Sequence, residues 1–129
     1  MVLSGTLACT GCKAKYPIES GIPRFVEREN YAASFGYQWT QFKFAQLDSC
    51  NGTTLSQKRW YAETGWTRES LSRKWVAEIG SGAGRFLDVL SRCDCDVIGV
   101  DISEAVDAAA VTMIKEGALD NPKPDAVFG

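Results

Sequence analysis

Apolar residues in the second half of the chain form two short continuous runs, within WVAEIGS at 75–81 and DVIGVDIS at 96–103. Continuous rather than alternating apolar residues are typical of strands that are buried on both faces. Helical patterns follow them, GRFLDVLSRC at 84–93 and EAVDAAAVTMIKEG at 104–117, and DAVFG at 125–129 begins a third strand. The order β-α-β-α-β predicts an α/β fold in which the strands are parallel and helices pack on both faces of the sheet.

The two helical patterns carry signals for their ends and their faces. Ser103 stands where it would cap the second helix, and Gly117 stands where that helix would end. In the first helix we expect an apolar face and a mostly polar face, formed by Phe86, Leu87 and Leu90 and by Arg85, Asp88 and Arg92 respectively.

The first half of the chain has a different character. Residues 1–26 are rich in Gly, Pro and Cys and lack helical periodicity, which predicts short strands and turns. From 27 to 74 the chain is aromatic and amphipathic, which favours helices, with a turn predicted at DSCNGTT, residues 48–54. We therefore expect three parts: a small Cys-containing segment at 1–26, a helical segment at 27–74 and the start of the parallel-sheet domain at 75–129.

Composition and charge narrow the classes of function. The chain has 129 residues with 14 basic and 16 acidic side chains, so its charge does not indicate a nucleic-acid partner. It contains neither a run of about 18 apolar residues nor a signal peptide, from which we expect no membrane association and a cytoplasmic location. The five cysteines are an odd number and histidine is absent, which argues against a disulfide framework and excludes nucleophiles that need a histidine base.

The stretch VAEIGSGAGRF carries the main candidate chemistry. Because the strand turns at once into a helix, Gly80, Gly82 and Gly84 lie where free helix N–H groups meet the carboxyl edge of the sheet, which favours a ligand site. The spacing differs from the dinucleotide pattern GxGxxG, since the residue three after Gly82 is Arg85. Asp101 ends the next strand, where a carboxylate can accept hydrogen bonds from both hydroxyls of a ribose. The alternative is a tight turn that binds no ligand.

VAEIGSGAGRFLDVL followed by VIGVDIS resembles the first two motifs of class I S-adenosylmethionine-dependent methyltransferases, over residues 75 to about 115. The resemblance implies a partial Rossmann-like domain with S-adenosyl-L-methionine as cofactor. It implies that Asp101 binds the ribose and that Ile102 packs against the adenine. The residues that it places around the amino-acid side of the cofactor are Glu78, Gly80, Ser81, Gly82 and Gly84.

Two upstream stretches, YAASFGYQWTQFKFAQLDS and RWYAETGW, resemble a helical segment that precedes this fold in a bacterial group of such methyltransferases. There the segment covers the cofactor and substrate cleft. The resemblance makes Tyr37, Gln38 and Trp39 candidates for contacts with the cofactor, and gives Arg59 and Trp60 a weaker case. The alternative is that these aromatic residues belong to the core, as aromatic residues at helical spacing commonly do.

Cys9 and Cys12 form a CxxC pair in LACTGCKAKYPIESGIPRF, which resembles the second half of a zinc-ribbon-like module found ahead of many methyltransferase domains. The resemblance makes them candidate zinc ligands. A closed zinc site needs four ligands, so a single CxxC argues against zinc held within one chain, unless Cys50, Cys93 and Cys95 complete the set. A redox role is disfavoured because the pair does not open a helix.

The resemblance implies an enzyme that transfers a methyl group to an unidentified acceptor, with no residue assignable as a general base. The family's sheet has more strands than this chain supplies, so we expect a piece of a longer enzyme that exposes a sheet edge, through which it could self-associate. Two alternatives stay open: a non-catalytic interaction module or inactive fragment that docks on a partner enzyme, and a nucleotide-dependent oxidoreductase, which the early third glycine disfavours.

Overall fold

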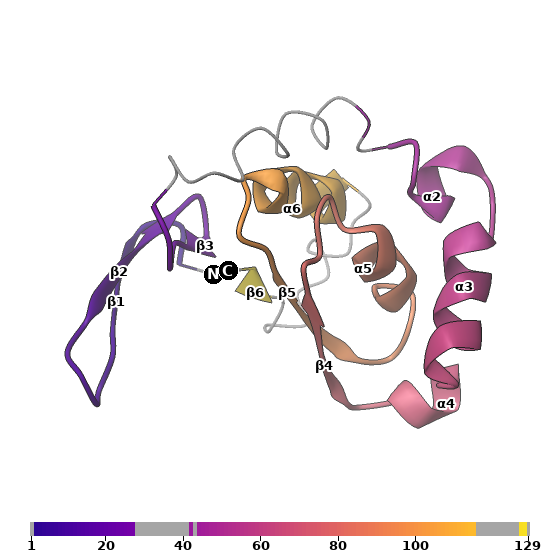
Figure 1. The fold of residues 1–129 in the computed structure, drawn as a ribbon, viewed down its shortest axis with the longest axis horizontal. Coiled ribbons are helices and arrows are strands. Elements are labelled where there is room, and N and C mark those ends of the chain that lie inside the picture. Colours follow the sequence, from indigo (N-terminus) through magenta and orange to yellow (C-terminus); the bar gives the residue numbers. More distant parts are fainter. Residues whose placement is uncertain (1, 28–41, 43, 116–126, 129) are drawn as a thin grey trace.

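The computed structural model describes residues 2–27, 42, 44–115 and 127–128 of the chain. They form two small sheets with short helices packed around the second one (Figure 1). The elements in chain order are β1 (Gly5–Ala8), β2 (Lys15–Glu19), β3 (Ile22–Pro23), α2 (Asp48–Asn51), α3 (Leu55–Thr64), α4 (Arg68–Leu71), β4 (Trp75–Ile79), α5 (Arg85–Leu90), β5 (Asp96–Val100), α6 (Ala105–Lys115) and β6 (Val127–Phe128).

The second half of the chain forms a parallel sheet in the order β4-β5-β6. β4 and β5 pair in register from Trp75 opposite Asp96 to Ile79 opposite Val100, and β6 adds to the other side of β5. α5 joins β4 to β5, and α6 follows β5. The predicted α/β class with parallel strands is therefore confirmed, although β5 ends at Val100 and not at residue 103.

Both of these helices pack on the same face of the parallel sheet. Leu87 of α5 and Val106 and Ala109 of α6 share one buried cluster, and Val97 of β5 packs against it. Strands added in one direction across a sheet place their right-handed crossovers on the same side, so the expectation of helices on both faces is not met in the described part of the chain. The exposed side chains on the other side of β4 are Trp75 (58%) and Ile79 (77%).

The N-terminal part is an antiparallel sheet in the order β1-β2-β3, which confirms the short strands and turns expected there. Residues 9–14 join β1 to β2, and this hairpin projects from one side of the molecule (Figure 1). Ile22 of β3 is buried in the same cluster as the side chains of α5 and α6. Just after β3, the Arg24 guanidinium donates a hydrogen bond to the Asp107 carboxylate of α6. The small sheet is thus anchored to α6.

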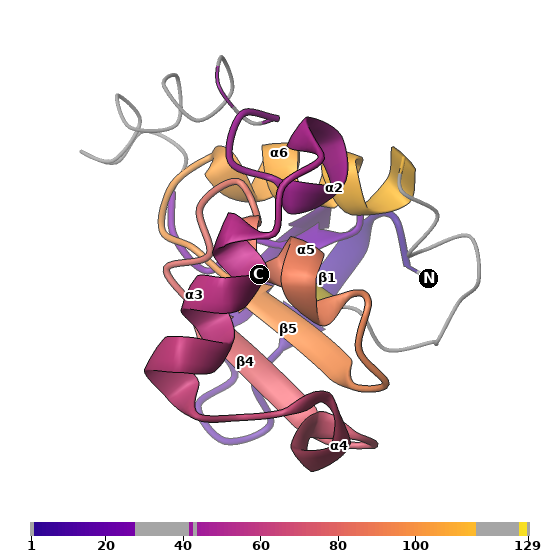
Figure 2. The same cartoon turned by 90° about the vertical axis from the view of Figure 1, so that its right-hand side faces the viewer.

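The helical segment α2–α4 packs against α5. Figure 1 and Figure 2 both show α3 alongside α5. Trp60 of α3 lies with its ring 5.5 Å from the Phe86 ring of α5 and 5.8 Å from the Trp66 ring, so Trp60 serves as a packing residue. It packs against a second buried cluster, which consists of Leu71, Val76, Leu90, Cys93 and Cys95.

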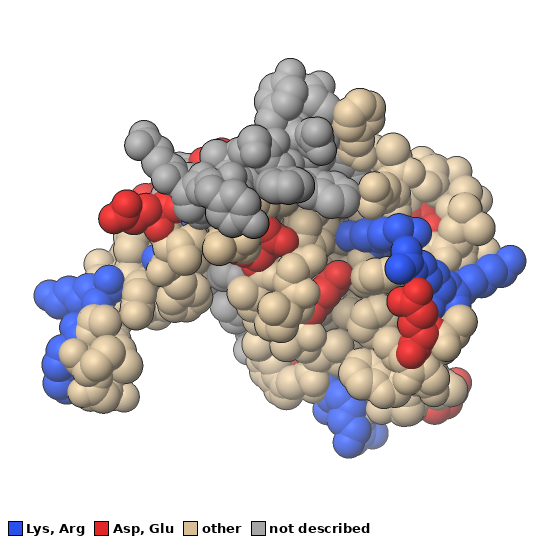
Figure 3. Space-filling view, viewed as in Figure 1, with Lys and Arg blue, Asp and Glu red and all other residues tan. Residues whose placement is uncertain are grey.

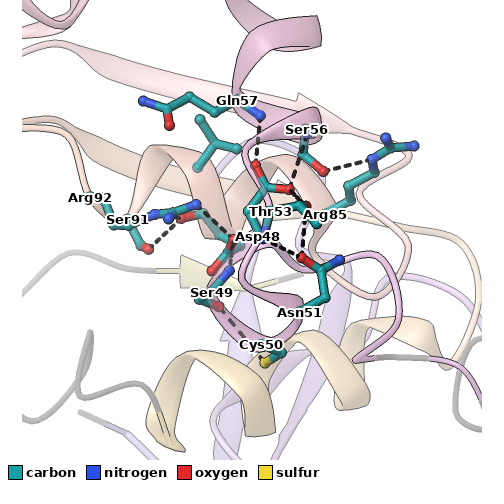
Figure 4. A network of polar contacts seen from close by, with 12 residues as sticks. Asp48, Ser49, Cys50, Asn51, Thr53, Ser56, Gln57, Arg85, Ser91 and Arg92 are labelled. Carbon is teal, nitrogen blue, oxygen red and sulfur yellow. Dashed lines mark hydrogen bonds and ion pairs between the residues drawn. The ribbon is translucent and has the colours of Figure 1, made fainter.

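The turn predicted at residues 48–54 begins later, because α2 occupies Asp48–Asn51 and the left-handed residue that ends it is Gly52, with φ 69°. The Asp48 side chain is buried and lies at the start of α3 (Figure 4). Its Oδ1 accepts from the Ser56 N–H at 3.1 Å and its Oδ2 from the Gln57 N–H at 2.9 Å. Asp48 therefore caps the N-terminus of α3.

A second buried carboxylate, Asp88 of α5, lies beside this network. Its Oδ2 accepts from the Ser49 N–H of α2 at 3.3 Å and from the Arg92 guanidinium at 2.9 Å. Nearby, Arg85 Nε donates to the Ser56 hydroxyl at 3.0 Å. Asp88, which the sequence places on the mostly polar side of α5, is buried there because α2 covers that side of the helix.

We expect Asp48→Ala to destabilise the protein by about 1–3 kcal/mol, because two N–H donors at the start of α3, one buried and one partly buried, lose a charged acceptor. Urea unfolding followed by circular dichroism measures this loss. The matched control is Glu63→Ala in the same helix, where an exposed pair with Arg59 is removed and the expected loss is below about 1 kcal/mol.

The effect of Asp48→Ala should also depend on pH. Burial opposes ionisation of Asp48, but the N–H donors of Gln57 and Ser56 outweigh it and hold the pKa below its ordinary value. The stabilisation is present above that ordinary value and disappears as the pH falls through the lowered pKa. Equal losses from the two variants at neutral pH would contradict the capping role.

Candidate functional site

The connection from β4 to α5 is a turn of glycines in left-handed backbone conformations. Gly80, Gly82 and Gly84 have φ angles of 76°, 53° and 90°, a region that other residues occupy at a cost. The N–H groups of Gly80 and Ser81 both donate to the carbonyl oxygen of Val100, at 2.7 and 3.1 Å. The turn is thereby fixed against the carboxyl end of β5, as the strand-to-helix pattern of the sequence predicts.

The first and third glycines have different surroundings. A Cβ atom built on Gly80 would have no atom within 4 Å, apart from its chain neighbours, so the main chain there faces open space. A Cβ atom on Gly84 would lie 3.3 Å from the Cβ of Ala109 in α6. Gly84 lines neither of the two cavities described next. Its place is at the N-cap of α5, where it permits close packing of α6.

Two cavities adjoin at Gly80, which lines both of them. The larger has a volume of about 370 Å³ and the smaller of about 180 Å³, and the larger lies within the range usual for small-molecule sites. The larger cavity is lined by Pro23, Arg24, Phe25, Val26, Glu27, Ile79, Gly80, Val100, Asp101, Ile102, Ser103, Glu104 and Val106. The smaller is lined by Phe42, Gln46, Leu47, Glu78, Gly80, Ser81, Gly82, Ala83, Arg85 and Phe86.

Asp101 lies in the larger cavity with both oxygens engaged by its own chain. Its Oδ2 accepts from the Gly82 N–H at 2.7 Å, and its Oδ1 accepts from the Ser103 N–H at 2.8 Å and the Ser103 hydroxyl at 2.6 Å. A carboxylate has about four lone-pair sites, so little capacity is left for a ligand in this arrangement. The sequence correctly places Asp101 at the carboxyl edge of the sheet. It does not reveal that the carboxylate holds the glycine turn through a hydrogen bond from the Gly82 N–H.

Ser103 caps α6 as the sequence predicts, since its hydroxyl oxygen accepts from the Ala105 N–H at 3.3 Å. The same hydroxyl donates to Asp101. The start of α6, the end of β5 and the glycine turn are therefore joined through two side chains.

Two buried polar atoms in the smaller cavity have no hydrogen-bond partner among the described residues. They are Oε2 of Glu78 and the hydroxyl of Ser81, a residue that is only 4% exposed. Buried polar atoms are nearly always paired, so these two atoms are candidates for hydrogen bonds with groups other than the described residues.

The Glu78 carboxyl has an unusual proton affinity. Its pKa is raised to about 7, mainly by burial and in part by the nearby negative charge of Asp101, while a backbone hydrogen bond from Leu87 acts in the opposite direction. The carboxyl groups of Glu78 and Asp101 therefore lie close enough together at the glycine turn to interact electrostatically. A cationic group in the smaller cavity would relieve this repulsion and favour the ionised form of Glu78.

Apolar side chains from two distant parts of the chain wall the larger cavity. Ile79 is the last residue of β4, and Ile102 comes shortly after the end of β5 and is 57% exposed. Phe25 and Val26 come from the segment after β3, and the Phe25 ring packs edge-on against Tyr16 at 5.1 Å. The sequence motifs do not mark these two residues, because only the docking of the small sheet on α6 brings them to the cavity.

The structure describes only some of the residues of the helical segment that we expect to contact the cofactor. Tyr37, Gln38 and Trp39 lie outside the described residues. Further along the same stretch, Phe42 and Leu47 line the smaller cavity. Arg59 pairs with Glu63 on the exposed side of α3 at 2.8 Å and lines neither cavity.

The cysteines do not converge on one place. Cys9 and Cys12 are exposed in the β1–β2 turn, Cys50 is exposed on α2, and Cys93 and Cys95 are buried between α5 and β5. Nowhere in the described part of the chain do three or more His, Cys, Asp or Glu side chains gather closely enough to hold a metal ion. A zinc site of four ligands therefore does not fit within these residues.

When the sequence was compared with protein-family models and with curated proteins, neither comparison found a match. Among the helices that the structure describes, none combines the length and apolar character needed to cross a membrane.

We expect Gly84→Ala to destabilise the protein more than Gly80→Ala. Both variants place a Cβ atom on a left-handed residue, which costs about 1–2 kcal/mol, but only Gly84→Ala also pushes α6 away through Ala109. Thermal unfolding of the two variants measures the difference. The reverse order would contradict the packing role assigned to Gly84.

We expect Glu78→Gln to become more favourable relative to the wild type as the pH rises. Between the ordinary value of 4.5 and about 7, folded Glu78 keeps a proton that the unfolded chain has released, so the wild-type free energy of unfolding falls with rising pH. The glutamine side chain does not ionise, so the free energy of unfolding of the variant does not contain this pH-dependent loss. Its advantage should grow across that interval and level off above it.

Urea unfolding at a series of pH values checks the Glu78 prediction, with Glu63→Gln as a control for the same substitution at an exposed position. A pH dependence of Glu78→Gln no larger than that of the control would contradict the prediction.

Proposed function

We propose that this chain is the cofactor-binding part of a class I S-adenosylmethionine-dependent methyltransferase with a partial Rossmann-like domain. The observation that carries the proposal is the pair of unpartnered buried atoms on Glu78 and Ser81, beside a glycine turn at the carboxyl edge of a parallel sheet. Ligands of open parallel α/β sheets bind outside that edge. The motif resemblance of residues 75 to about 115 supports the same assignment.

In this proposal the two cavities hold the two ends of one cofactor, which crosses the bare main chain at Gly80. The amino-acid end occupies the smaller cavity, where its ammonium group pairs with Glu78 and its carboxylate faces the N–H groups of the turn. The nucleoside occupies the larger cavity, where Ile102 and Phe25 offer apolar contact for the purine. Asp101 is the ribose ligand.

Binding of the ribose requires a rearrangement at Asp101. One of its lone-pair sites remains for a ribose hydroxyl, and rotation of the Ser103 hydroxyl frees a second one, because that hydrogen bond depends on a single torsion. The Gly82 N–H bond is then kept and continues to hold the turn. In this arrangement Asp101 can contact the ribose and still accept the hydrogen bond from the Gly82 N–H.

The cofactor, when bound, supplies an activated methyl group on its sulfonium. The residues of this chain bind it, orient it and exclude water, so that an acceptor can approach in line with the methyl–sulfur bond. A neutral Glu78 gains negative charge when the ammonium binds, so binding at pH values below about 7 should release a proton.

A second candidate function, a module that docks on a partner enzyme, is favoured by one observation. Trp75 and Ile79, the second of which also lines the larger cavity, present large exposed apolar side chains on the face of β4 that none of the described helices covers. Such exposed apolar surface commonly marks interaction sites. This candidate needs no ligand at the glycine turn, and a binding measurement therefore separates the two.

We expect the protein to bind S-adenosylhomocysteine but not NAD in isothermal titration calorimetry. Asp101→Asn should weaken the binding of S-adenosylhomocysteine by about 1–3 kcal/mol, the cost of losing a charged hydrogen-bond acceptor. The matched control is Asp96→Asn, which makes the same change at the opposite end of β5, away from both cavities, and should leave the affinity unchanged.

Circular dichroism must first show that all three proteins are folded. Binding of NAD alone would favour an oxidoreductase. Failure of a folded wild-type protein to bind either compound would contradict the proposal and favour the docking module.

A further inference from the structure

The wall of the smaller cavity carries one carboxyl group and one guanidinium. Among the described residues that line this cavity, the two with charged side chains are Glu78 and Arg85. Within the described part of the chain, Oε2 of Glu78 has no hydrogen-bond partner, and the Arg85 guanidinium hydrogen bonds to Ser56 and pairs with no carboxylate. Two opposite charges that line one cavity without pairing are suited to a ligand that carries both charges.

The backbone of the glycine turn has little left to offer to an anion. The N–H groups that donate to acceptors of this chain are those of Gly80, Ser81, Gly82 and Gly84. A ligand carboxylate that faces the turn therefore needs a further donor from a side chain. Arg85 follows the turn directly, as the first residue of α5, and lines the same cavity.

The Arg85 side chain is held in place by the start of α3. Its Nε donates to the hydroxyl of Ser56 at 3.0 Å (Figure 4), and this hydroxyl donates to the Gln46 carbonyl oxygen at 3.1 Å. Ser56 is only 1% exposed, so the anchor is rigid. The two terminal nitrogens of the guanidinium keep their N–H donors in one plane, the arrangement that matches both oxygens of a carboxylate.

Other basic side chains gather nearby but stand in solvent. Figure 3 shows them over α3, where Lys58 and Arg59 are exposed. Charges in that position are screened by water and salt, and neither residue lines the cavity. Arg85 is partly buried and lies with its guanidinium carbon 5.5 Å from the centre of the Phe86 ring, another wall of the same cavity. Its charge is therefore the one that a ligand inside the cavity meets at close range.

We propose that Arg85 binds the carboxylate of an α-amino-acid group in the smaller cavity, opposite Glu78, and makes the site selective for a ligand with such a zwitterionic end. The ammonium group lies on the Glu78 side, so the two charges of the ligand meet opposite charges of the wall. The hydroxyl of Ser81, 4% exposed and without a partner among the described residues, can donate to the same carboxylate. This inference rests on the proposed function and names the residue that recognises the carboxylate of the cofactor.

The test compares two ligands by isothermal titration calorimetry: S-adenosylhomocysteine and its decarboxylated analogue, which keeps the nucleoside, the sulfur and the ammonium group. We expect the wild type to prefer S-adenosylhomocysteine by about 10- to 100-fold, the range for hydrogen bonds to a charged group. Arg85→Met should bind both compounds with the affinity that the wild type has for the analogue. Arg85→Lys keeps the charge without the planar fork and should keep part of the preference.

The matched control is Arg59→Met, which removes an exposed arginine that pairs with Glu63 and lines neither cavity. It should keep the full preference, and circular dichroism shows which variants are folded. A wild type that binds both compounds equally would overturn the inference and leave the proposed function standing. A folded Arg85→Met or Arg85→Lys with the full preference would do the same. A folded wild type that binds neither compound would overturn both.

Discussion

The left-handed main chain at Gly80 and Gly82 is the constraint on which the rest of the candidate site depends. It allows β4 to turn directly into α5, and the carbonyl oxygen of Val100 then holds the turn through two N–H groups. The Asp101 carboxylate also accepts a hydrogen bond from the Gly82 N–H of the same turn. The ends of the two parallel strands are thereby joined, and both cavities adjoin Gly80, where an added Cβ atom would meet no atom within 4 Å apart from its chain neighbours.

Three buried or half-buried carboxylates of the chain show how the use of a carboxylate depends on its partners. Asp48 and Asp88 are buried but accept hydrogen bonds from backbone N–H groups, which makes them structural links between α2, α3 and α5. Glu78 keeps one oxygen without a partner among the described residues, and burial raises its pKa to about 7. A carboxyl that the fold leaves unsatisfied beside a cavity is the better candidate for a ligand contact.

The N-terminal segments contribute to the site through packing and not through motifs. Ile22 enters the core of α5 and α6, and Arg24 pairs with Asp107, so the segment that follows β3 becomes a wall of the larger cavity. On the other side, the network of Asp48 and Asp88 holds α2 against α5 and brings Leu47 to the smaller cavity. Both walls come from the part of the chain before β4, where the sequence offered no strand-turn-helix pattern.

The sequence by itself determined the local features: two buried strands, the helices between and after them, the glycine turn, the Ser103 cap and the position of Asp101 at the strand end. Each of these follows from neighbouring residues, through apolar runs, backbone freedom and capping. Only the tertiary structure decided that Asp88 is buried and that Gly84 packs closely against Ala109. It also decided that Asp101 binds the Gly82 N–H of the turn and that Phe25 lines the larger cavity. These features depend on contacts between residues far apart in the chain, and periodicity and spacing do not encode which distant segment will cover a given face.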